Sequence, residues 1–77
     1  MAKKDELKYE IVEHIATLET FASGYTRELN LVKWNDGEPK YDIRNWNADH
    51  TKCSSGITLF KYEAEQIVKA LKKHLKK

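Results

Sequence analysis

The sequence predicts an α+β fold in which a curved four-stranded antiparallel sheet is followed by an amphipathic C-terminal helix (ββββα). Three observations predict it. The first part of the chain is rich in β-branched and aromatic residues, and clusters of turn residues divide it into short runs. After Leu59 the spacing of the apolar residues changes from a period of two to a period of about 3.6.

Residues 7–21 predict a first strand that is long and bent. Apolar residues alternate with charged ones in its first part, and the apolar positions then change parity at Val12. Because one extra residue exchanges the two faces of a strand, this change indicates a bulge or a strong bend. Three apolar residues, Ile11, Ile15 and Leu18, also fit helical spacing, which leaves a helix as the alternative.

Three more strands are predicted from the turns between them. A small connection, residues 22–24, contains a glycine, and the run Asn-Asp-Gly-Glu-Pro at residues 35–39 is dense in turn formers. Pro39 cannot donate a ladder hydrogen bond, so it belongs at the start or edge of a strand. The predicted strands are residues 25–34, 40–46 and 56–59, with a polar loop before the last.

An amphipathic helix is predicted after the last strand. Its apolar residues fall on one stripe at helical spacing: Phe60, Ala64, Ile67, Val68, Leu71 and Leu75. Acidic residues in the first turns and lysines in the last complement the helix dipole. Phe60 or Lys61 stands where a polar N-cap is expected, so the cap is predicted to be poor. Such a helix can cover one side of the sheet and leave the other side exposed.

Length and composition limit the possible classes of protein. The 77 residues predict a single small domain, with residues 1–6 as a flexible tail, and small domains often oligomerise. One cysteine excludes an intrachain disulfide and favours a reducing cytoplasm. The charged N-terminus is unlike a signal peptide, and no segment has the apolar length of a membrane span. The formal net charge of +2 does not by itself imply nucleic acid.

No residue pattern indicates catalysis or a cofactor. The sequence has no nucleophile beside a recognisable base, no glycine-rich phosphate loop and no distinctive pair of carboxylates. His50 and Cys53 could share a zinc ion, but neither of the other two histidines has a partner nearby in sequence. We therefore expect neither an enzyme, a metal site nor a cofactor.

One face of the predicted third strand gathers cationic and aromatic residues. Lys40, Asp42, Arg44 and Trp46 alternate with the residues of the other face, so a regular strand places them together. Such a face suits single-stranded nucleic acid, because rings stack on bases and cations contact phosphates. The structural alternative is that the tryptophans are core residues and the charges are only the solvated face of the sheet.

The ordered set of motifs resembles a known family. The run WNDGEPKYDIR at residues 34–44, Trp46, the run GITL at residues 56–59 and the terminal helix are similar to the transcriptional positive cofactor four family, and more closely to its small bacterial YdbC-like members. The resemblance covers nearly the whole chain. It implies a homodimer formed through helices and sheet, and largely sequence-independent binding of single-stranded DNA by the sheet.

The resemblance also assigns binding residues. Trp34 and Arg44 match the family's aromatic and arginine, and Trp46 matches its tryptophan approximately. Members often carry lysine where this chain has Ser55, so that backbone contact is absent or moves to Lys52. The residues predicted to bind nucleic acid are Trp34, Trp46, Arg44, Lys40, Lys33, Lys52, Arg27 and Tyr25.

The expected role is that of a transcriptional coactivator or regulator, or of a protein of replication or repair, in the bacterial cytoplasm and nucleoid. Components of the transcription machinery are further candidate partners, and no membrane is expected. RNA is a variant of the expected ligand, because stacking surfaces do not exclude ribose. The alternative from another class is a protein interaction module that uses the exposed sheet or helix.

Overall fold

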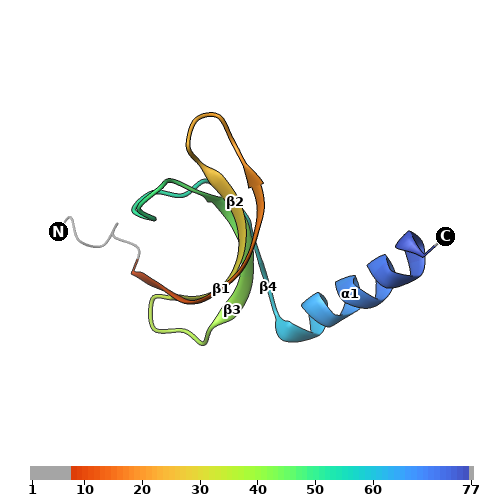
Figure 1. The fold of residues 1–77 in the computed structure, drawn as a ribbon. Coiled ribbons are helices and arrows are strands. Elements are labelled where there is room, and N and C mark those ends of the chain that lie inside the picture. The colour runs from red at the N-terminus through yellow and green to blue at the C-terminus, as the bar shows by residue number, and fades with distance from the viewer. Residues whose placement is uncertain (1–7, 77) are drawn as a thin grey trace.

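The computed structural model describes residues 8–76 and confirms the predicted α+β fold (Figure 1). Its elements are β1 (Tyr9–Thr20), β2 (Thr26–Trp34), β3 (Lys40–Trp46), β4 (Ile57–Leu59) and α1 (Lys61–Leu75). The strands form one antiparallel sheet in the order β1-β2-β3-β4. The start of the first strand at Leu7 and the tail 1–6, both predicted from the sequence, lie outside the described residues.

β1 is bent by three irregularities. Its register against β2 shifts at Val12, at Ile15 and at Leu18, so one apolar residue is inserted at each of these points. An inserted residue bends a strand and increases its twist. The bulge predicted from the parity change at Val12 is therefore confirmed, two further bulges follow it, and the helical alternative is wrong.

The sheet curls around a concave side, while α1 projects from the opposite, convex side (Figure 1). Alternate residues of β2 and β3 lie on the concave face, among them Val32 and Trp46, which are fully buried. The same face also buries three polar side chains, Glu28, Asn30 and Asp42. The interior of this small domain is thus largely polar and aromatic, and its polar groups need hydrogen-bond partners within the sheet.

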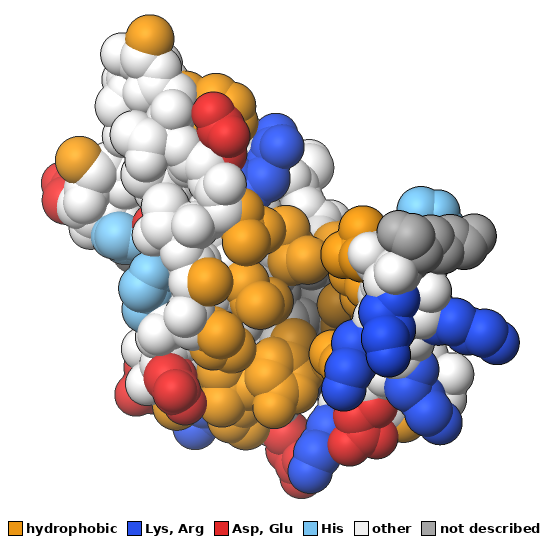
Figure 2. Space-filling model, turned by 45° about the vertical axis from the view of Figure 1, so that its right-hand side comes forward, with side chains coloured by type: hydrophobic (Ala, Val, Ile, Leu, Met, Phe, Trp, Pro, Cys, Tyr) orange, Lys and Arg blue, Asp and Glu red, His pale blue; other side chains and the backbone are white. Residues whose placement is uncertain are grey.

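The convex face is apolar and open. Strand alternation places these apolar residues of β2, β3 and β4 on it: Leu29, Leu31, Tyr41, Ile43, Ile57 and Leu59. The inserted residues Val12, Ile15 and Leu18 add further apolar surface and are 45%, 41% and 50% exposed. Figure 2 shows hydrophobic side chains gathered over the sheet beside the helix. These side chains leave an apolar patch exposed on the convex face.

α1 does not cover the sheet, which corrects the arrangement expected from the sequence. Only Phe60, in an extended conformation, links β4 to α1, and this short connection directs the helix away from the sheet (Figure 1). No residue of α1 is buried, and its apolar stripe stays open to solvent, with Val68 56% and Leu71 49% exposed. No helix within residues 8–76 has the length and apolar character needed to cross a membrane.

The helix start is capped from within its first turn. The backbone N–H of Phe60 donates a hydrogen bond of 2.8 Å to the carboxylate of Glu63. In a capping box, the side chain three residues into the helix accepts the N–H of the cap residue, as Glu63 does here. The Phe60 side chain has no oxygen that could accept a backbone N–H in return. The poor polar cap predicted from the sequence is therefore partly compensated.

Candidate nucleic-acid interface

Three aromatic rings from three strands meet on the concave face. Tyr9 lies 5.8 Å from Trp34 and 5.3 Å from Trp46 between ring centroids. The two indoles are nearly parallel, at 13°, with centroids 6.5 Å apart. Trp46 pairs with Thr26, which is eight residues from Trp34 along β2, so a flat sheet would separate the two tryptophans by about 26 Å. The curl of the sheet therefore brings them together.

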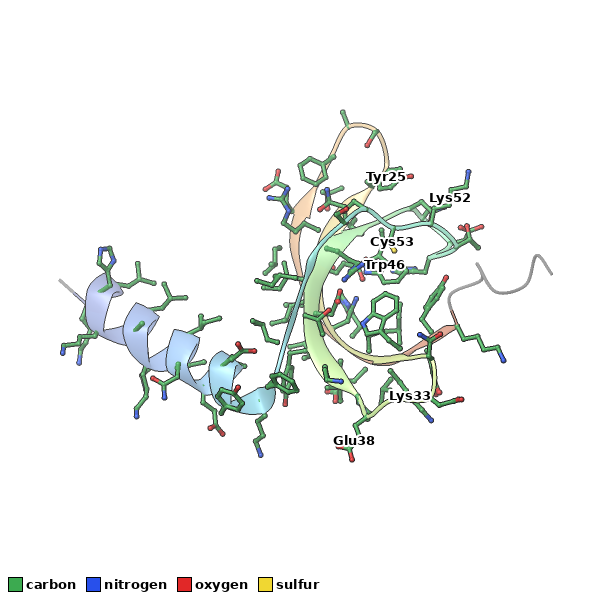
Figure 3. All side chains as sticks on the ribbon, turned by 180° about the vertical axis from the view of Figure 1, so that it is seen from behind. Tyr25, Lys33, Glu38, Trp46, Lys52 and Cys53 are labelled. Atoms are coloured by element: carbon green, nitrogen blue, oxygen red, sulfur yellow. The ribbon has the colours of Figure 1, made fainter. Side chains whose placement is uncertain are left out.

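The two tryptophans differ in exposure. Trp46 is fully buried, with the His50 ring 5.6 Å away, and Figure 3 shows it inside the concave side. Trp34 is half-buried. The expectation that Trp46 stacks on a base disagrees with this burial, because no face of its ring reaches solvent. Trp46 instead supports Trp34, which is the tryptophan that a ligand can reach.

Arg44 packs on Trp34 and is neutralised by Asp42. Its guanidinium carbon lies 4.6 Å from the centroid of the Trp34 ring. Its Nε and Nη2 donate to the two carboxylate oxygens of Asp42 at 2.7 and 2.8 Å, and Thr58 Oγ1 donates to the same carboxylate at 2.9 Å. Burial alone would lower the pKa of Arg44, but Asp42 raises it above its ordinary value. Arg44 thus stays charged and fixes the Trp34 ring, with much of its charge balanced by Asp42.

Gly56 makes room for Arg44. A Cβ at this position would collide with the Arg44 Cβ and with the carbonyl oxygen of Ile43. Only glycine fits without a shift of β3 or β4. The glycine of the run GITL therefore has a packing role in the same network.

A second cluster surrounds the carboxylate of Glu28. His50 Nε2 lies 3.1 and 3.0 Å from its two oxygens, and His14 Nδ1 lies 3.5 Å from Oε1. Thr26 and Asn30 donate hydrogen bonds to it at 2.6 and 3.0 Å. Burial alone would raise the pKa of Glu28, but these hydrogen bonds and the charge of His50 lower it below its ordinary value. The carboxylate is therefore ionised at neutral pH.

The loop between β3 and β4 holds His50 over the cluster. Asn47 organises the loop, because its Oδ1 accepts the backbone N–H groups of Thr51 and Lys52, both at 2.9 Å. His50 has a left-handed backbone, with φ of 59°, and its carbonyl oxygen accepts the Tyr9 hydroxyl. Two strands therefore hold this loop in place, β1 through Tyr9 and β2 through Glu28.

The cations predicted from the sequence do not gather beside Trp34. Arg27 and Lys33 alternate with the concave residues of β2, so they lie on the convex face, and Arg27 packs on the Phe21 ring at 5.2 Å. Lys40 pairs with Val32 of the concave face, but its Nζ turns toward the start of α1 and lies 5.6 Å from the centroid of the Phe60 ring. Arg44 alone among the predicted cations contacts Trp34.

The remaining two predicted residues lie at the margin of the sheet. Lys52 is exposed in the loop after β3, and Tyr25 is half-buried just before β2 (Figure 3). Four further residues belong to the concave face but were not predicted from the sequence: Tyr9, His14, Glu28 and His50. The alternation of β2 could have indicated Glu28, whereas the bulges of β1 and the left-handed loop conceal the positions of the two histidines.

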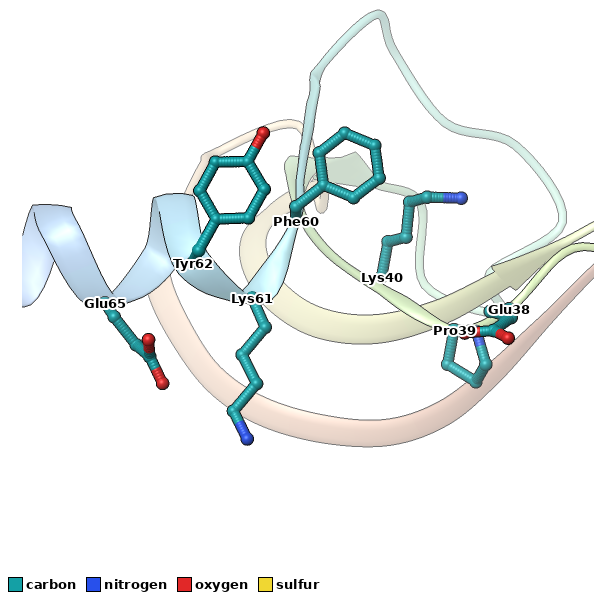
Figure 4. A pocket seen from close by; sticks show the side chains of 7 residues that line it. All are labelled: Glu38, Pro39, Lys40, Phe60, Lys61, Tyr62 and Glu65. Atoms are coloured by element: carbon teal, nitrogen blue, oxygen red, sulfur yellow. The ribbon is translucent and has the colours of Figure 1, made fainter.

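An open groove of about 700 Å³ lies where α1 leaves the sheet (Figure 4). The rings of Phe60 and Tyr62 stack in it at 5.6 Å, and Lys40, Lys61, Glu38 and Glu65 line it. Two lysines are balanced by two glutamates, so its charge does not favour a polyanion. Within residues 8–76, no group of three or more His, Cys, Asp or Glu side chains has the arrangement of a metal site.

The chain is similar in sequence to a known protein over 59 residues. No family model matches the chain. A protein of Treponema pallidum (strain Nichols) is 39% identical over 59 residues, which cover 77% of this chain and 69% of the relative. The chain belongs to the family of this treponemal protein. The treponemal relative is described as an uncharacterized protein, and this description assigns no activity to the family.

Proposed function

We propose that the protein binds single-stranded DNA on the concave face of its sheet, largely without sequence preference. Bases stack on Trp34, and Lys52 at the margin of the sheet contacts phosphates. The observation that carries this proposal is the half-buried Trp34 ring, held by Arg44 at 4.6 Å and backed by two further aromatic rings. A rigid, accessible π surface is what sequence-tolerant binding of a single strand requires.

The motif residues behind the family resemblance support the proposal, because they form one contiguous network. Arg44 contacts Trp34 and Asp42, Thr58 bonds to Asp42, and Gly56 packs against Arg44. Residues from three separate parts of the sequence thus hold one ring in place. On this basis we propose a role as transcriptional coactivator or regulator, or in replication or repair, in the bacterial cytoplasm and nucleoid.

We also propose that the protein is a homodimer in which α1 of each copy covers the convex face of the other. The chain carries two exposed apolar surfaces, the convex face and the stripe of α1, which are complementary in chemistry. A two-fold arrangement would bury both at once, since the same pair of surfaces meets twice. Such a dimer leaves the concave face free for DNA. A different protein partner on these apolar surfaces is the alternative.

Titration of labelled oligonucleotides tests the binding proposal. We expect single-stranded DNA to bind more tightly than duplex, with log K falling linearly in log salt by about 0.7 for each phosphate contacted. Equal binding to both forms, or binding to neither, would contradict it. A parallel titration with RNA of the same sequence distinguishes the ribose variant.

Substitution of Trp34 tests the stacking surface. Trp34→Ala should weaken binding by about 1 to 3 kcal/mol, whereas Trp34→Phe keeps a ring and should retain most of the affinity. Arg27→Gln is the matched control, because it removes a cation from the convex face. If Arg27→Gln weakened DNA binding more than Trp34→Ala, the DNA would bind on the convex face, which would contradict the proposal. Circular dichroism of each variant checks that the fold is kept.

A further inference from the structure

Two histidines flank Glu28 on the concave face. The side chains of His14 and His50 are 49% and 38% exposed, whereas that of Glu28 is 5% exposed. Together with Ile11 they line an open cavity of about 350 Å³. Two side chains of the type that ordinarily gains or loses a proton between mildly acidic and neutral pH therefore border this cavity.

The hydrogen-bond partners indicate which nitrogen of each ring carries the proton. A carboxylate only accepts, so His50 Nε2 donates to Glu28. The Asn30 amide nitrogen donates to Glu28, which leaves its Oδ1 to accept from His14 Nδ1 at 2.7 Å. Neutral His14 therefore carries its lone pair on Nε2, which accepts a hydrogen bond from the Thr17 hydroxyl at 3.1 Å. Neutral His50 has it on Nδ1, which bonds to no group in residues 8–76.

Protonation consequently adds one N–H donor to each ring, on the side away from Glu28. It also changes the local charge. Protonation of both histidines makes this part of the face two charges more positive, because Glu28 stays ionised and Asp42 and Arg44 balance each other.

Other ionisable groups do not reverse this change. The groups that face the cluster are Tyr9 and His14 from β1, Glu28 from β2, Asp42 and Arg44 from β3, and Asp49 in the loop beside His50. The hydroxyl of Thr51 lowers the pKa of Asp49 below its ordinary value, so Asp49 keeps its charge throughout the range in which histidine titrates. Among residues 8–76, His14 and His50 are the side chains on this face whose type ordinarily gains or loses a proton between mildly acidic and neutral pH.

We propose that His14 and His50 are proton-dependent contacts for the phosphodiester backbone of a nucleic acid on the concave face. This inference rests on the proposed binding of single-stranded DNA. An imidazolium donates a charge-assisted hydrogen bond to a phosphate oxygen, whereas a neutral ring with a free lone pair repels it. Binding therefore takes up protons, and affinity rises as pH falls.

The test is a titration with oligothymidylate, whose bases do not titrate in the range of histidine, at constant ionic strength. We expect the protein to bind at least about tenfold more tightly at about pH 5.5 than at about pH 8. The slope of log K against log salt should steepen at the lower pH by about 0.7 for each histidine that contacts a phosphate.

Matched variants separate titration from structure. His14→Asn keeps an N–H donor at the Nδ1 position for Asn30, and His50→Gln keeps one at the Nε2 position for Glu28, but neither side chain titrates. The double variant should bind as the unmodified protein does at about pH 8 and lose the pH dependence. His74→Gln, on the exposed surface of α1, should leave the pH profile unchanged.

Each outcome decides the inference. Binding with the same affinity at both pH values, or an unchanged pH profile in the double variant, would overturn the role of the histidines and leave the proposed DNA binding intact. No binding at any pH would overturn both. If melting curves show that the double variant is unfolded, the two single variants replace it, and each should lose part of the pH dependence of DNA affinity. An unchanged pH dependence in both single variants would overturn the inference.

Discussion

At the scale of single residues, Gly56 is the clearest test of how the site is packed. An added Cβ meets Arg44 and the backbone of Ile43, so Gly56→Ala should destabilise the protein by about 1 to 3 kcal/mol and displace Arg44 from Trp34. Urea unfolding measures the first effect and tryptophan fluorescence the second. Gly37→Ala is the control, since a Cβ there meets only one carbonyl oxygen, at 3.3 Å. Equal costs for the two variants would contradict the crowding at Gly56.

Glu28 predicts how stability depends on pH. Its pKa is lowered in the folded protein by hydrogen bonds from Thr26, Asn30 and His50, which outweigh the effect of burial. The unfolded chain therefore binds its proton at a higher pH than the folded protein does. The stabilisation by this carboxylate is fully present above its ordinary pKa and is lost as pH falls through the folded value.

Glu28→Gln should remove that part of the pH dependence. Urea unfolding of both proteins between about pH 7 and about pH 3 measures it, and the difference in unfolding free energy should shrink in acid. A difference that stays constant over this range would show that Glu28 does not titrate with folding. Asp36→Asn, an exposed carboxylate in the β2–β3 turn, serves as the control.

At the scale of elements, sequence patterns predicted the bounds and bends of strands where residues adjacent in sequence determine them. β3 has the predicted bounds, because Pro39 ends the turn before it and a polar loop follows it. The parity change at Val12 predicted one bulge. The shifts at Ile15 and Leu18 were not evident, since both residues also fit a regular strand or a helix.

Long-range placement was harder to predict. The apolar stripe of α1 predicts that the helix packs against an apolar surface, but it does not predict which surface. The link between β4 and α1 is the single residue Phe60, and this short link directs the helix away from its own sheet. In the site, the family motif indicated Arg44 and Trp34 as separate candidates, and their contact was not predicted. The sequence left open whether Trp46 is a core residue, because its burial depends on a curl that closes the ends of β2 and β3 on each other.

The exposed stripe of α1 predicts a separation between stability and assembly. Val68→Asp with Leu71→Asp should change the unfolding free energy of the single chain by about 0.5 kcal/mol or less, since neither residue is buried. The same pair should prevent dimerisation, because it places two charges in the proposed interface. Lys69→Ser, on the polar side of the helix, is the control. Unfolding measured at low protein concentration isolates the first effect.

At the scale of the whole molecule, light scattering with size exclusion tests the dimer. The unmodified chain should elute with twice the 9.0 kDa mass of one chain, and the doubly substituted helix variant with the mass of one. Such an interface should bury roughly 1,600 Å² in total. A monomeric mass for the unmodified protein at micromolar concentration would contradict the dimer. If the doubly substituted helix variant is a monomer and still binds oligonucleotide, the concave face of a single chain is sufficient for binding.

The strand order β1-β2-β3-β4 also has a consequence for folding kinetics. Every strand pairs with its neighbour in sequence, so each ladder closes through a short connection and the contact order of the chain is low for a β-rich protein. Each hairpin can form as soon as its second strand leaves the ribosome, and folding of the single chain should not depend on its concentration. Joining two copies is bimolecular, so a slow phase that accelerates with protein concentration would report assembly.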